Sequence, residues 1–291
     1  MFTTLIDAHE LAGYRANPDW VLLDCRFELA RPDWGPQAYA AGHIPGALYA
    51  HLDQDLSSPV TAHSGRHPLP TPELFAATLG RWGIDSRVQV VAYDQGNSMY
   101  AARLWWLLRW AGHAAAAVLN GGFAAWQEAG LPVSATVARR AARTFAPRIQ
   151  AHALVSTDEV LELVNAGKLQ GGAQMLIDAR GADRFAGQNE TLDAVAGHIP
   201  GAHSAPFAGN LDPRGHFLPP AMLRERWQQR LQATPATDVI SMCGSGVTAC
   251  HNLLALEHAG LSGARLYAGS WSEWIRDPGR PTEPPRTASA R

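Results

Sequence analysis

The sequence predicts an α/β protein of two tandem domains, each with a mostly parallel sheet flanked by helices. The first observation behind this prediction is a six-residue motif, GHIPGA, which occupies positions 42–47 and returns letter for letter at 197–202. A duplicated motif of this kind indicates a duplicated structural unit. The second observation is that short apolar runs alternate with stretches of helical periodicity in both copies, which is typical of strands alternating with helices.

The predicted elements follow one another in the same order in both copies. Short runs rich in apolar residues predict strands at 21–24, 88–93, 117–119, 175–178, 238–242 and 264–267. Between the second and third strands, residues 100–110 carry apolar side chains at helical spacing and predict a helix that faces the core. Large aromatic side chains dominate cores, so the tryptophans of this helix are interpreted as packing residues.

The repeat also suggests where the domains begin and end. We expect an N-terminal domain at 1–135, a linker at 136–152, a C-terminal domain at 153–276 and a tail at 277–291. Helical and strand periodicity disappears between Pro132 and His152, which is typical of a linker. The tail is rich in proline and poor in apolar residues, and we expect it to be loosely ordered.

Composition and charge exclude several classes of partner. The chain of 291 residues has 24 Lys+Arg against 26 Asp+Glu, a net charge of −2, so no overall basic field gathers nucleic acid or an anionic membrane. No apolar stretch approaches the length of a membrane-spanning helix. The 3 cysteines are too few and too scattered for a disulfide framework. A cytoplasmic protein that binds neither nucleic acid nor membrane is therefore expected.

One cysteine stands where a reacting group is expected. Aligning the two copies places Asp94 and Cys243 at the same strand end, and ligands of open parallel sheets bind outside the carboxyl ends of strands. Residues 243–247, here called the cysteine loop, contain two glycines and lead directly into a predicted helix. Backbone N–H groups of such a loop and helix start converge on one point, the sulfur of Cys243. We expect them to lower the pKa of this thiol below its free value of about 8.5 and to hold a persulfide on the same sulfur.

Several cysteines, histidines and one aspartate are compatible with a purely structural role. Cys243 could be one more buried apolar residue, although a core cysteine has no need of such a loop. Cys25 and Cys250 are interpreted as structural, and the spacing of cysteines and histidines does not supply a metal site. His43 and His198 occur identically in both copies and are expected to bond loop backbone. Asp94 is expected to be structural or a helix-start cap.

The CGSGVTA stretch that begins at Cys243, the two GHIPGA copies and the strand end Asp178-Ala179-Arg180 together resemble the tandem-domain rhodanese-type sulfurtransferases. Within that group the loop is similar to that of 3-mercaptopyruvate sulfurtransferases. The resemblance implies two rhodanese-like domains, the first noncatalytic and the second catalytic, and no metal or organic cofactor. It also implies an enzyme whose cysteine takes a sulfane sulfur from a small-molecule donor and passes it to a thiol, such as thioredoxin or glutathione, or to cyanide.

The resemblance assigns roles to individual residues. The nucleophile maps to Cys243, and the family's relay of serine, aspartate and histidine maps to Ser245, Asp53 and His67. The arginine that grips the anionic group of the donor maps to Arg184. The remaining residues expected to bind substrate belong to the cysteine loop and the helix start, namely Gly244, Gly246, Val247 and Thr248.

The preferred donor stays open between 3-mercaptopyruvate and thiosulfate. Mercaptopyruvate enzymes carry a second arginine nine residues after the first, but this chain has Asp193 there. Thiosulfate enzymes instead place cations on the loop, and Gly244 and Ser245 offer none. A single arginine can bind the one carboxylate of a keto acid, and the hydroxyl of Ser245 can donate a hydrogen bond to its carbonyl. We therefore expect 3-mercaptopyruvate to be the preferred donor. Arg184 could instead form a surface ion pair of little consequence.

Two other functions are typical of proteins with a cysteine or a related loop at this position. A phosphatase of the cysteine-loop type needs an arginine six positions after its cysteine, and this chain has Ala249 there. A noncatalytic binding module would be expected to lose the cysteine, as Asp94 illustrates in the first copy, whereas Cys243 keeps its whole loop. Neither the physiological acceptor nor the oligomeric state follows from the sequence.

Overall fold

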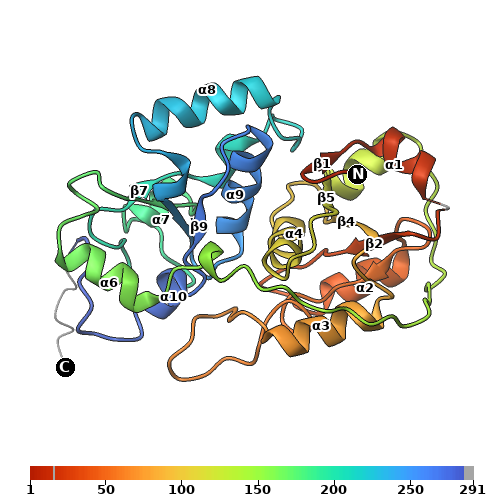
Figure 1. The fold of residues 1–291 in the computed structure, drawn as a ribbon, viewed down its shortest axis with the longest axis horizontal. Coiled ribbons are helices and arrows are strands. Elements are labelled where there is room, and N and C mark those ends of the chain that lie inside the picture. Colours follow the sequence, from red (N-terminus) through yellow and green to blue (C-terminus); the bar gives the residue numbers. More distant parts are fainter. Residues whose placement is uncertain (16, 285–291) are drawn as a thin grey trace. The chain divides into compact units, whose positions relative to one another are not determined.

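The computed structural model describes residues 1–15 and 17–284. These residues divide into two compact units, each of which is visible in Figure 1. The N-terminal unit comprises Met1–Pro59, Leu69–Ala151 and Leu211–Pro219. The C-terminal unit comprises Val60–Pro68, His152–Asn210 and the chain from Pro220 onward. Residues 60–68, here called the arm, therefore group with the C-terminal unit, while the expected domain and linker boundaries stay predictions.

The N-terminal unit is an α/β layer structure. Its strands are Leu5–Ile6 (β1), Trp20–Asp24 (β2), Leu48–Tyr49 (β3), Gln89–Tyr93 (β4) and Ala116–Leu119 (β5). They form a parallel sheet in the order β1-β5-β4-β2-β3. The helices are Ala8–Tyr14 (α1), Trp34–Ala41 (α2), Pro72–Arg81 (α3), Ala101–Trp110 (α4) and Gly122–Glu128 (α5).

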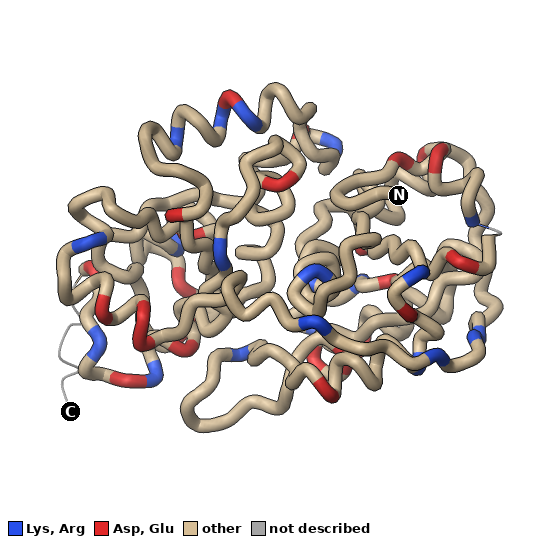
Figure 2. The backbone as a smooth tube through the Cα atoms, viewed as in Figure 1, with Lys and Arg blue, Asp and Glu red and all other residues tan. Residues whose placement is uncertain are grey.

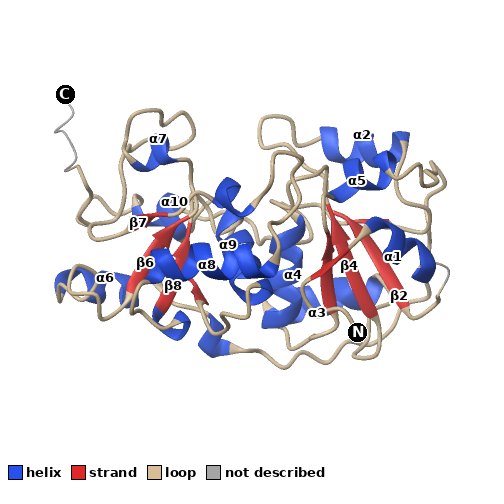
Figure 3. Ribbon diagram, turned by 90° about the horizontal axis from the view of Figure 1, so that it is seen from above, coloured by secondary structure: helices blue, strands red, loops and turns tan. Residues whose placement is uncertain are grey.

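The C-terminal unit repeats this architecture. Its strands are Met175–Asp178 (β6), His203–Ser204 (β7), Val239–Met242 (β8) and Arg265–Leu266 (β9), paired in parallel in the order β7-β6-β8-β9. The helices are Thr157–Asn165 (α6), Ala182–Phe185 (α7), Pro220–Leu231 (α8), Thr248–His258 (α9) and Ser270–Trp274 (α10). Short 3₁₀ turns lie at Ala151–Ala153 (η1), Phe207–Asn210 (η2) and Ala236–Asp238 (η3). In each unit helices flank the strands (Figure 3), which confirms the predicted α/β class.

Burial explains why the central strands could be predicted from the sequence. Every residue of β2, β4, β5, β6 and β8 is buried. Strands covered on both faces read as continuous apolar runs rather than as an alternation of apolar and polar residues. The predicted core helix is α4, and its Trp105, Trp106 and Trp110 are buried, which confirms that they are packing residues.

In each unit the same buried ion pair, between the aspartate and the arginine at the end of β2 or β6, links that strand end to the GHIPGA turn. Arg26 binds Asp24 through Nε and Nη2, at 2.9 and 2.6 Å from Oδ2, and Arg180 binds Asp178 in the same way. Nη2 of each arginine also donates to the carbonyl of the first glycine of the GHIPGA turn, at 2.7 and 2.8 Å. The motifs recur because together they fasten the end of β2 or β6 to the following turn.

The histidines of the two GHIPGA turns hold backbone, as predicted. Nδ1 of His43 lies 2.7 Å from the carbonyl of Tyr39, and Nδ1 of His198 lies 2.8 Å from the carbonyl of Phe185. Each ring also stacks on the side chain of that same residue. A structural role therefore accounts for both histidines.

The chain beyond α10 is better ordered than its composition suggests. Trp274 Nε1 donates to the carbonyl of Pro281, and the backbones of His198 and Glu283 exchange two hydrogen bonds of 2.8 and 2.9 Å. The expectation of a loosely ordered tail is therefore wrong for 281–283, because these backbone groups have partners in the C-terminal unit. Residues 285–291 of the tail lie outside the described residues.

Acidic and basic residues are interspersed along both units (Figure 2), in keeping with the nearly balanced composition. Among the residues described, none of the helices combines the length and the apolar character that crossing a bilayer requires.

Candidate active site

Cys243 lies directly beyond the carboxyl end of a central strand. Met242, the last residue of β8, pairs with Asp178 of β6, so Cys243 is the first residue past the sheet. The Sγ atom of Cys243 accepts hydrogen bonds from the N–H groups of Gly246, at 3.2 Å, and Ser245, at 3.5 Å. The cysteine loop thus curls around its own sulfur, although a role in catalysis stays a prediction.

Hydrogen bonds from the start of α10 fix the backbone of the cysteine loop. The N–H groups of Trp271 and Ser272 donate to the carbonyls of Cys243 and Gly244, at 3.0 and 2.9 Å. The N–H of Cys243 donates to Oγ of Ser270 at 3.1 Å. These bonds turn the carbonyls of the loop away from the sulfur and leave its amides to face it. Sequence reasoning did not identify Ser270.

Gly246 has a backbone conformation that favours glycine. Its φ is +76°, in the left-handed region that residues with a Cβ atom avoid. A Cβ at this position would also collide with the carbonyl oxygen of Ala268. The tight return of the cysteine loop toward Sγ therefore needs a glycine on two independent grounds.

The corresponding position of the N-terminal unit holds a carboxylate in a similar ring of amides. Asp94, the first residue past β4, accepts through Oδ1 from the N–H groups of Gly96 and Ser98, at 3.1 and 3.0 Å. Its Oδ2 accepts from those of Tyr100 and Ala101, at 2.9 and 3.2 Å. Burial raises the pKa of Asp94, and these hydrogen bonds offset part of that rise. Asp94 is thus the structural cap that the sequence predicts.

Two of the residues assigned to a relay meet in the C-terminal unit. Nδ1 of His67, on the arm, lies 2.8 Å from Oγ of Ser245 in the cysteine loop, and both side chains are buried. Asp53 lies in the turn after β3 of the N-terminal unit, where its N–H donates to Nδ1 of His51 at 3.1 Å. The part of Asp53 in a relay therefore stays a prediction.

Arg184, on α7, is engaged by two acidic residues. Its Nη2 lies 2.8 Å from Oε1 of Glu190 and 3.1 Å from Oδ2 of Asp193. Burial raises the pKa of Glu190, but hydrogen bonds from Arg184 and from the N–H groups of Leu192 and Asp193 outweigh this, so the pKa lies below its usual value. Both carboxylates are buried, which distinguishes this cluster from an exposed surface ion pair. Sequence reasoning missed Glu190.

A second guanidinium lies over the cysteine loop. A Cβ on Gly244 would come within 2.9 Å of Nη2 of Arg66 and 3.7 Å of Nη2 of Arg184. Nη1 of Arg66 forms an ion pair with Asp193, which therefore binds both arginines. Sequence reasoning missed Arg66, and the available signal was its place next to His67 on the chain.

The remaining residues of the predicted site have clear local positions. Val247 occupies the N-cap position of α9, and Thr248 is the first residue of the helix, so their amides lie where a helix has unpaired N–H groups and a positive end. Cys250 is buried within α9, where its thiol donates to the carbonyl of Gly246 at 3.3 Å. Cys25 is also buried, which raises the pKa of its thiol. The described residues contain no group of three or more potential metal ligands.

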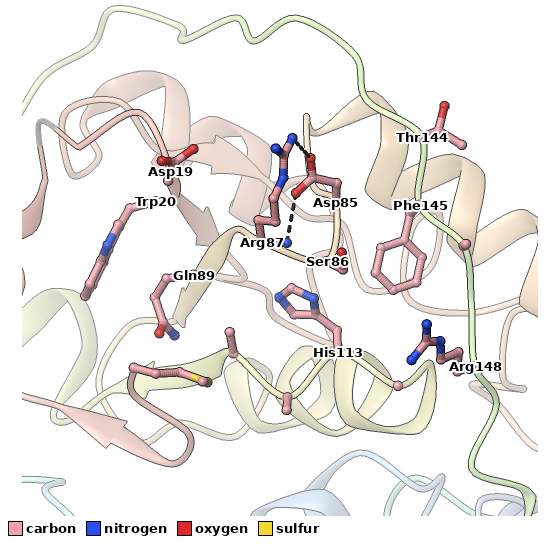
Figure 4. A pocket seen from close by; sticks show the side chains of 15 residues that line it. Asp19, Trp20, Asp85, Ser86, Arg87, Gln89, His113, Thr144, Phe145 and Arg148 are labelled. Carbon is pink, nitrogen blue, oxygen red and sulfur yellow. Dashed lines mark hydrogen bonds and ion pairs between the residues drawn. The ribbon is translucent and has the colours of Figure 1, made fainter.

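A cavity of about 770 Å³ lies in the N-terminal unit, where the side chains that line it are drawn in Figure 4. Trp20 and Gln89, the first residues of β2 and β4, line it together with His113. It therefore lies at the amino ends of these strands, whereas ligands of parallel sheets bind at the carboxyl ends. No residue of the predicted site lines this cavity.

Comparison with known proteins agrees with this architecture. The profile of the rhodanese-like domain matches residues 7–129 and 156–277. A probable 3-mercaptopyruvate sulfurtransferase of Pseudomonas aeruginosa is 45% identical over 279 residues, which cover 95% of this chain and 96% of that protein. A thiosulfate sulfurtransferase of Gallus gallus is 34% identical over 243 residues, which cover 82% of this chain and 80% of that protein.

The similarity extends to three dimensions. The crystal structure of SseA from Escherichia coli, described among 3-mercaptopyruvate sulfotransferases, matches with a TM-score of 0.79 and 32% identity, over 93% of this chain and 100% of that one. The resemblance expected from the GHIPGA copies and the cysteine loop is thereby confirmed. With one match of the profile in each half, this chain belongs to the rhodanese-like family and carries two copies of its domain.

Proposed function

We propose that this protein is a sulfurtransferase that moves a sulfane sulfur from 3-mercaptopyruvate, through a persulfide on Cys243, to a thiol or to cyanide. The observation that carries the proposal is the pair of N–H groups, from Ser245 and Gly246, that point at Sγ of Cys243. Such donors stabilise an anionic sulfur, which is the nucleophile that sulfur transfer requires. The sulfurtransferases of Pseudomonas aeruginosa and Gallus gallus that the chain is similar to support the same reaction class.

The first half of the reaction loads the enzyme. The thiolate of Cys243 attacks the sulfur of 3-mercaptopyruvate, an S–S bond forms, and the C–S bond of the donor breaks. The electron pair of the C–S bond passes into the keto acid as an enolate. The enolate takes up the proton released from the S–H group of the donor and leaves as pyruvate, so the outer sulfur stays on Cys243 as a persulfide anion. The hydroxyl of Ser245, bonded to His67, is placed to donate to the developing enolate oxygen.

The second half of the reaction unloads the enzyme. An acceptor thiolate attacks the outer sulfur of the persulfide, the S–S bond breaks, and its electron pair returns to Cys243 as the thiolate. An acceptor thiol leaves as a persulfide, and cyanide leaves as thiocyanate. We propose thioredoxin or glutathione, both thiols of the cytoplasm, as the acceptor.

The hydrogen bonds of Asp94 in the N-terminal unit indicate how the corresponding cysteine loop could bind the outer sulfur of a persulfide on Cys243. A carboxylate places an oxygen one bond beyond the γ atom, as a persulfide places its outer sulfur one bond beyond Sγ. In the N-terminal unit that oxygen accepts from the amides of Tyr100 and Ala101, at the start of α4. The amides at the start of α9, those of Val247 and Thr248, are the corresponding donors for an outer sulfur on Cys243.

The charge around Arg184 favours a donor with one negative charge. Glu190 and Asp193 balance the charges of Arg184 and Arg66, so these four side chains together carry no net charge. Adding a second negative charge there, as in the thiosulfate dianion, costs more than adding the single carboxylate of a keto acid. A thiosulfate-specific enzyme is the second candidate, because Asp193 stands where mercaptopyruvate enzymes carry an arginine.

Mass spectrometry of the intact protein tests the proposal. After incubation with 3-mercaptopyruvate and removal of the donor, we expect the wild type to gain one sulfur atom and to lose it again on addition of cyanide. Cys243→Ser should gain none, while Cys250→Ala and Cys25→Ala should gain sulfur as the wild type does. Persistent sulfur gain in Cys243→Ser would overturn the assignment. A higher kcat/KM for thiosulfate than for 3-mercaptopyruvate would favour the second candidate.

A further inference from the structure

We infer that Arg66 is a second donor-binding arginine and that, with Arg184, it holds the carboxylate of the sulfur donor above Gly244. The inference rests on the proposed function and adds to it a residue from a distant part of the chain. It explains how the protein binds an anionic donor although Asp193 occupies the position of the family's second arginine.

The arm presents Arg66 in a fixed place. The N–H of Arg66 donates to Oγ of Ser272 at 3.0 Å, and Nε of Arg276 donates to the carbonyl of Ser64 at 3.1 Å. Next along the arm, His67 is bonded to Ser245 of the cysteine loop. With hydrogen bonds on both sides of it, the backbone of Arg66 is anchored within the C-terminal unit rather than carried on a loose loop.

The two guanidinium groups converge on the residue next to Cys243. Nη2 of Arg66 and Nη2 of Arg184 would lie 2.9 and 3.7 Å from a Cβ on Gly244, so the missing side chain leaves the space in which they meet. Their side chains are 28% and 20% exposed, so a small solute can reach both. A carboxylate placed there would stand one residue away from the sulfur that attacks the donor.

Asp193 serves this arrangement by binding both arginines. Its Oδ1 contacts Nη1 of Arg66, and its Oδ2 lies 3.1 Å from Nη2 of Arg184. Since the ion pair engages the Nη1 end of Arg66, the Nη2 end near Gly244 is directed toward the donor. A guanidinium has five N–H donors, so it can bind a structural carboxylate and a substrate carboxylate at the same time. The second cation of this site comes from the arm, and the acid at position 193 orients it.

The experiment compares Arg66→Met in two backgrounds and with two donors. The donors are 3-mercaptopyruvate and its methyl ester, which has the same reacting atoms but no carboxylate charge. Loss of a hydrogen bond between charged groups predicts a fall of about 10- to 100-fold in kcat/KM for the acid, mostly through KM. We expect a change of less than about threefold for the ester. Arg66→Lys, which keeps the charge but not the planar fork, should lie between Arg66→Met and the wild type.

The second background separates substrate binding from mere neutralisation of Asp193. In Asp193→Asn the carboxylate is gone, so adding Arg66→Met should still lower kcat/KM for the acid at least about tenfold if Arg66 touches the donor. If adding Arg66→Met to Asp193→Asn has no effect, Arg66 only balances Asp193 and the inference is overturned. Equal losses with the acid and the ester would overturn it as well.

Controls distinguish this inference from the proposed function. Arg31→Met removes an exposed arginine that pairs with Glu28 and should leave both donors unaffected. Thermal unfolding of Arg66→Met and Arg66→Lys shows whether the fold persists. If the wild type gains no sulfur from either donor, the proposed function fails and the inference fails with it. If the wild type gains sulfur and Arg66→Met matches it with the acid, the inference alone fails.

Discussion

Replacing Gly246 by alanine tests whether the amides of the cysteine loop activate Cys243. A left-handed residue with a Cβ costs about 1–2 kcal/mol relative to glycine. The new Cβ would also collide with the carbonyl oxygen of Ala268, a backbone atom that cannot rotate aside. The loop must therefore shift at residue 246, and we expect the free energy of unfolding to fall by about 2 kcal/mol or more.

The same shift should affect the rate of sulfur transfer. The N–H of Gly246 lies 3.2 Å from Sγ of Cys243, and moving it away removes one of the donors that stabilise the anion. Removing one donor of an oxyanion hole lowers kcat by about 100- to 1,000-fold. We expect a loss at the lower end of that range, because the N–H of Ser245 stays beside the sulfur.

Rapid-mixing measurement of sulfur transfer from 3-mercaptopyruvate to Cys243, together with urea unfolding, checks both expectations. Gly167→Ala is the matched control, because Gly167 has φ +65° and a Cβ there would meet no heavy atom within 4 Å. This control should show the backbone cost of about 1–2 kcal/mol and an unchanged rate of transfer. A Gly246→Ala variant that transfers sulfur within about twofold of the wild-type rate would refute the role given to this amide.

Three further predictions follow from the described contacts. Ser245→Ala and His67→Phe should each lower kcat with 3-mercaptopyruvate by about tenfold or more, and the double variant should be no slower than the slower single variant, because the two side chains act as one unit. Asp94→Asn should lower the free energy of unfolding in urea by about 2 kcal/mol, because an amide group cannot accept all four backbone N–H bonds. Glu190 has a lowered pKa, so it stabilises the fold above about pH 4.3, and this contribution is lost as the pH falls further. The wild-type melting temperature should therefore drop more steeply on acidification below that pH than that of Glu190→Gln.

The central strands could be predicted from the sequence, as could the edge strand β9, expected at 264–267, whereas the edge strands β1, β3 and β7 could not. Strands β2, β4, β6 and β8 are buried along their whole length, so their apolar runs mark them within one residue at either end. The strands β1, β3 and β7 have two residues each. A segment that short has no period to detect, and it becomes a strand through pairing with a neighbour that is already in place.

The sequence indicates a candidate reacting group more readily than the charged residues around it. Cys243, Ser245 and His67 were proposed from a strand end and a family motif. Arg66 was missed because it meets Asp193 from 127 positions away, and Glu190 was missed although it pairs with Arg184 only six positions before it. From the sequence, Asp193 is known only as an acid at the position where mercaptopyruvate enzymes carry a second arginine. In the structure it is an acid bound between two arginines, one of which is 127 positions away along the chain. Neither periodicity nor spacing indicates which distant guanidinium will face a given carboxylate.

The two units together indicate why the N-terminal copy carries Asp94 rather than a small apolar residue. A loop that turns several amides inward needs an acceptor, because a buried N–H without a partner costs about 1–3 kcal/mol. In the C-terminal unit a sulfur accepts two of these amides, and the proposed persulfide would accept others. In the N-terminal unit the carboxylate of Asp94 accepts four. The N-terminal copy, which has an aspartate in place of the thiol, therefore still fills its ring of amides with an acceptor.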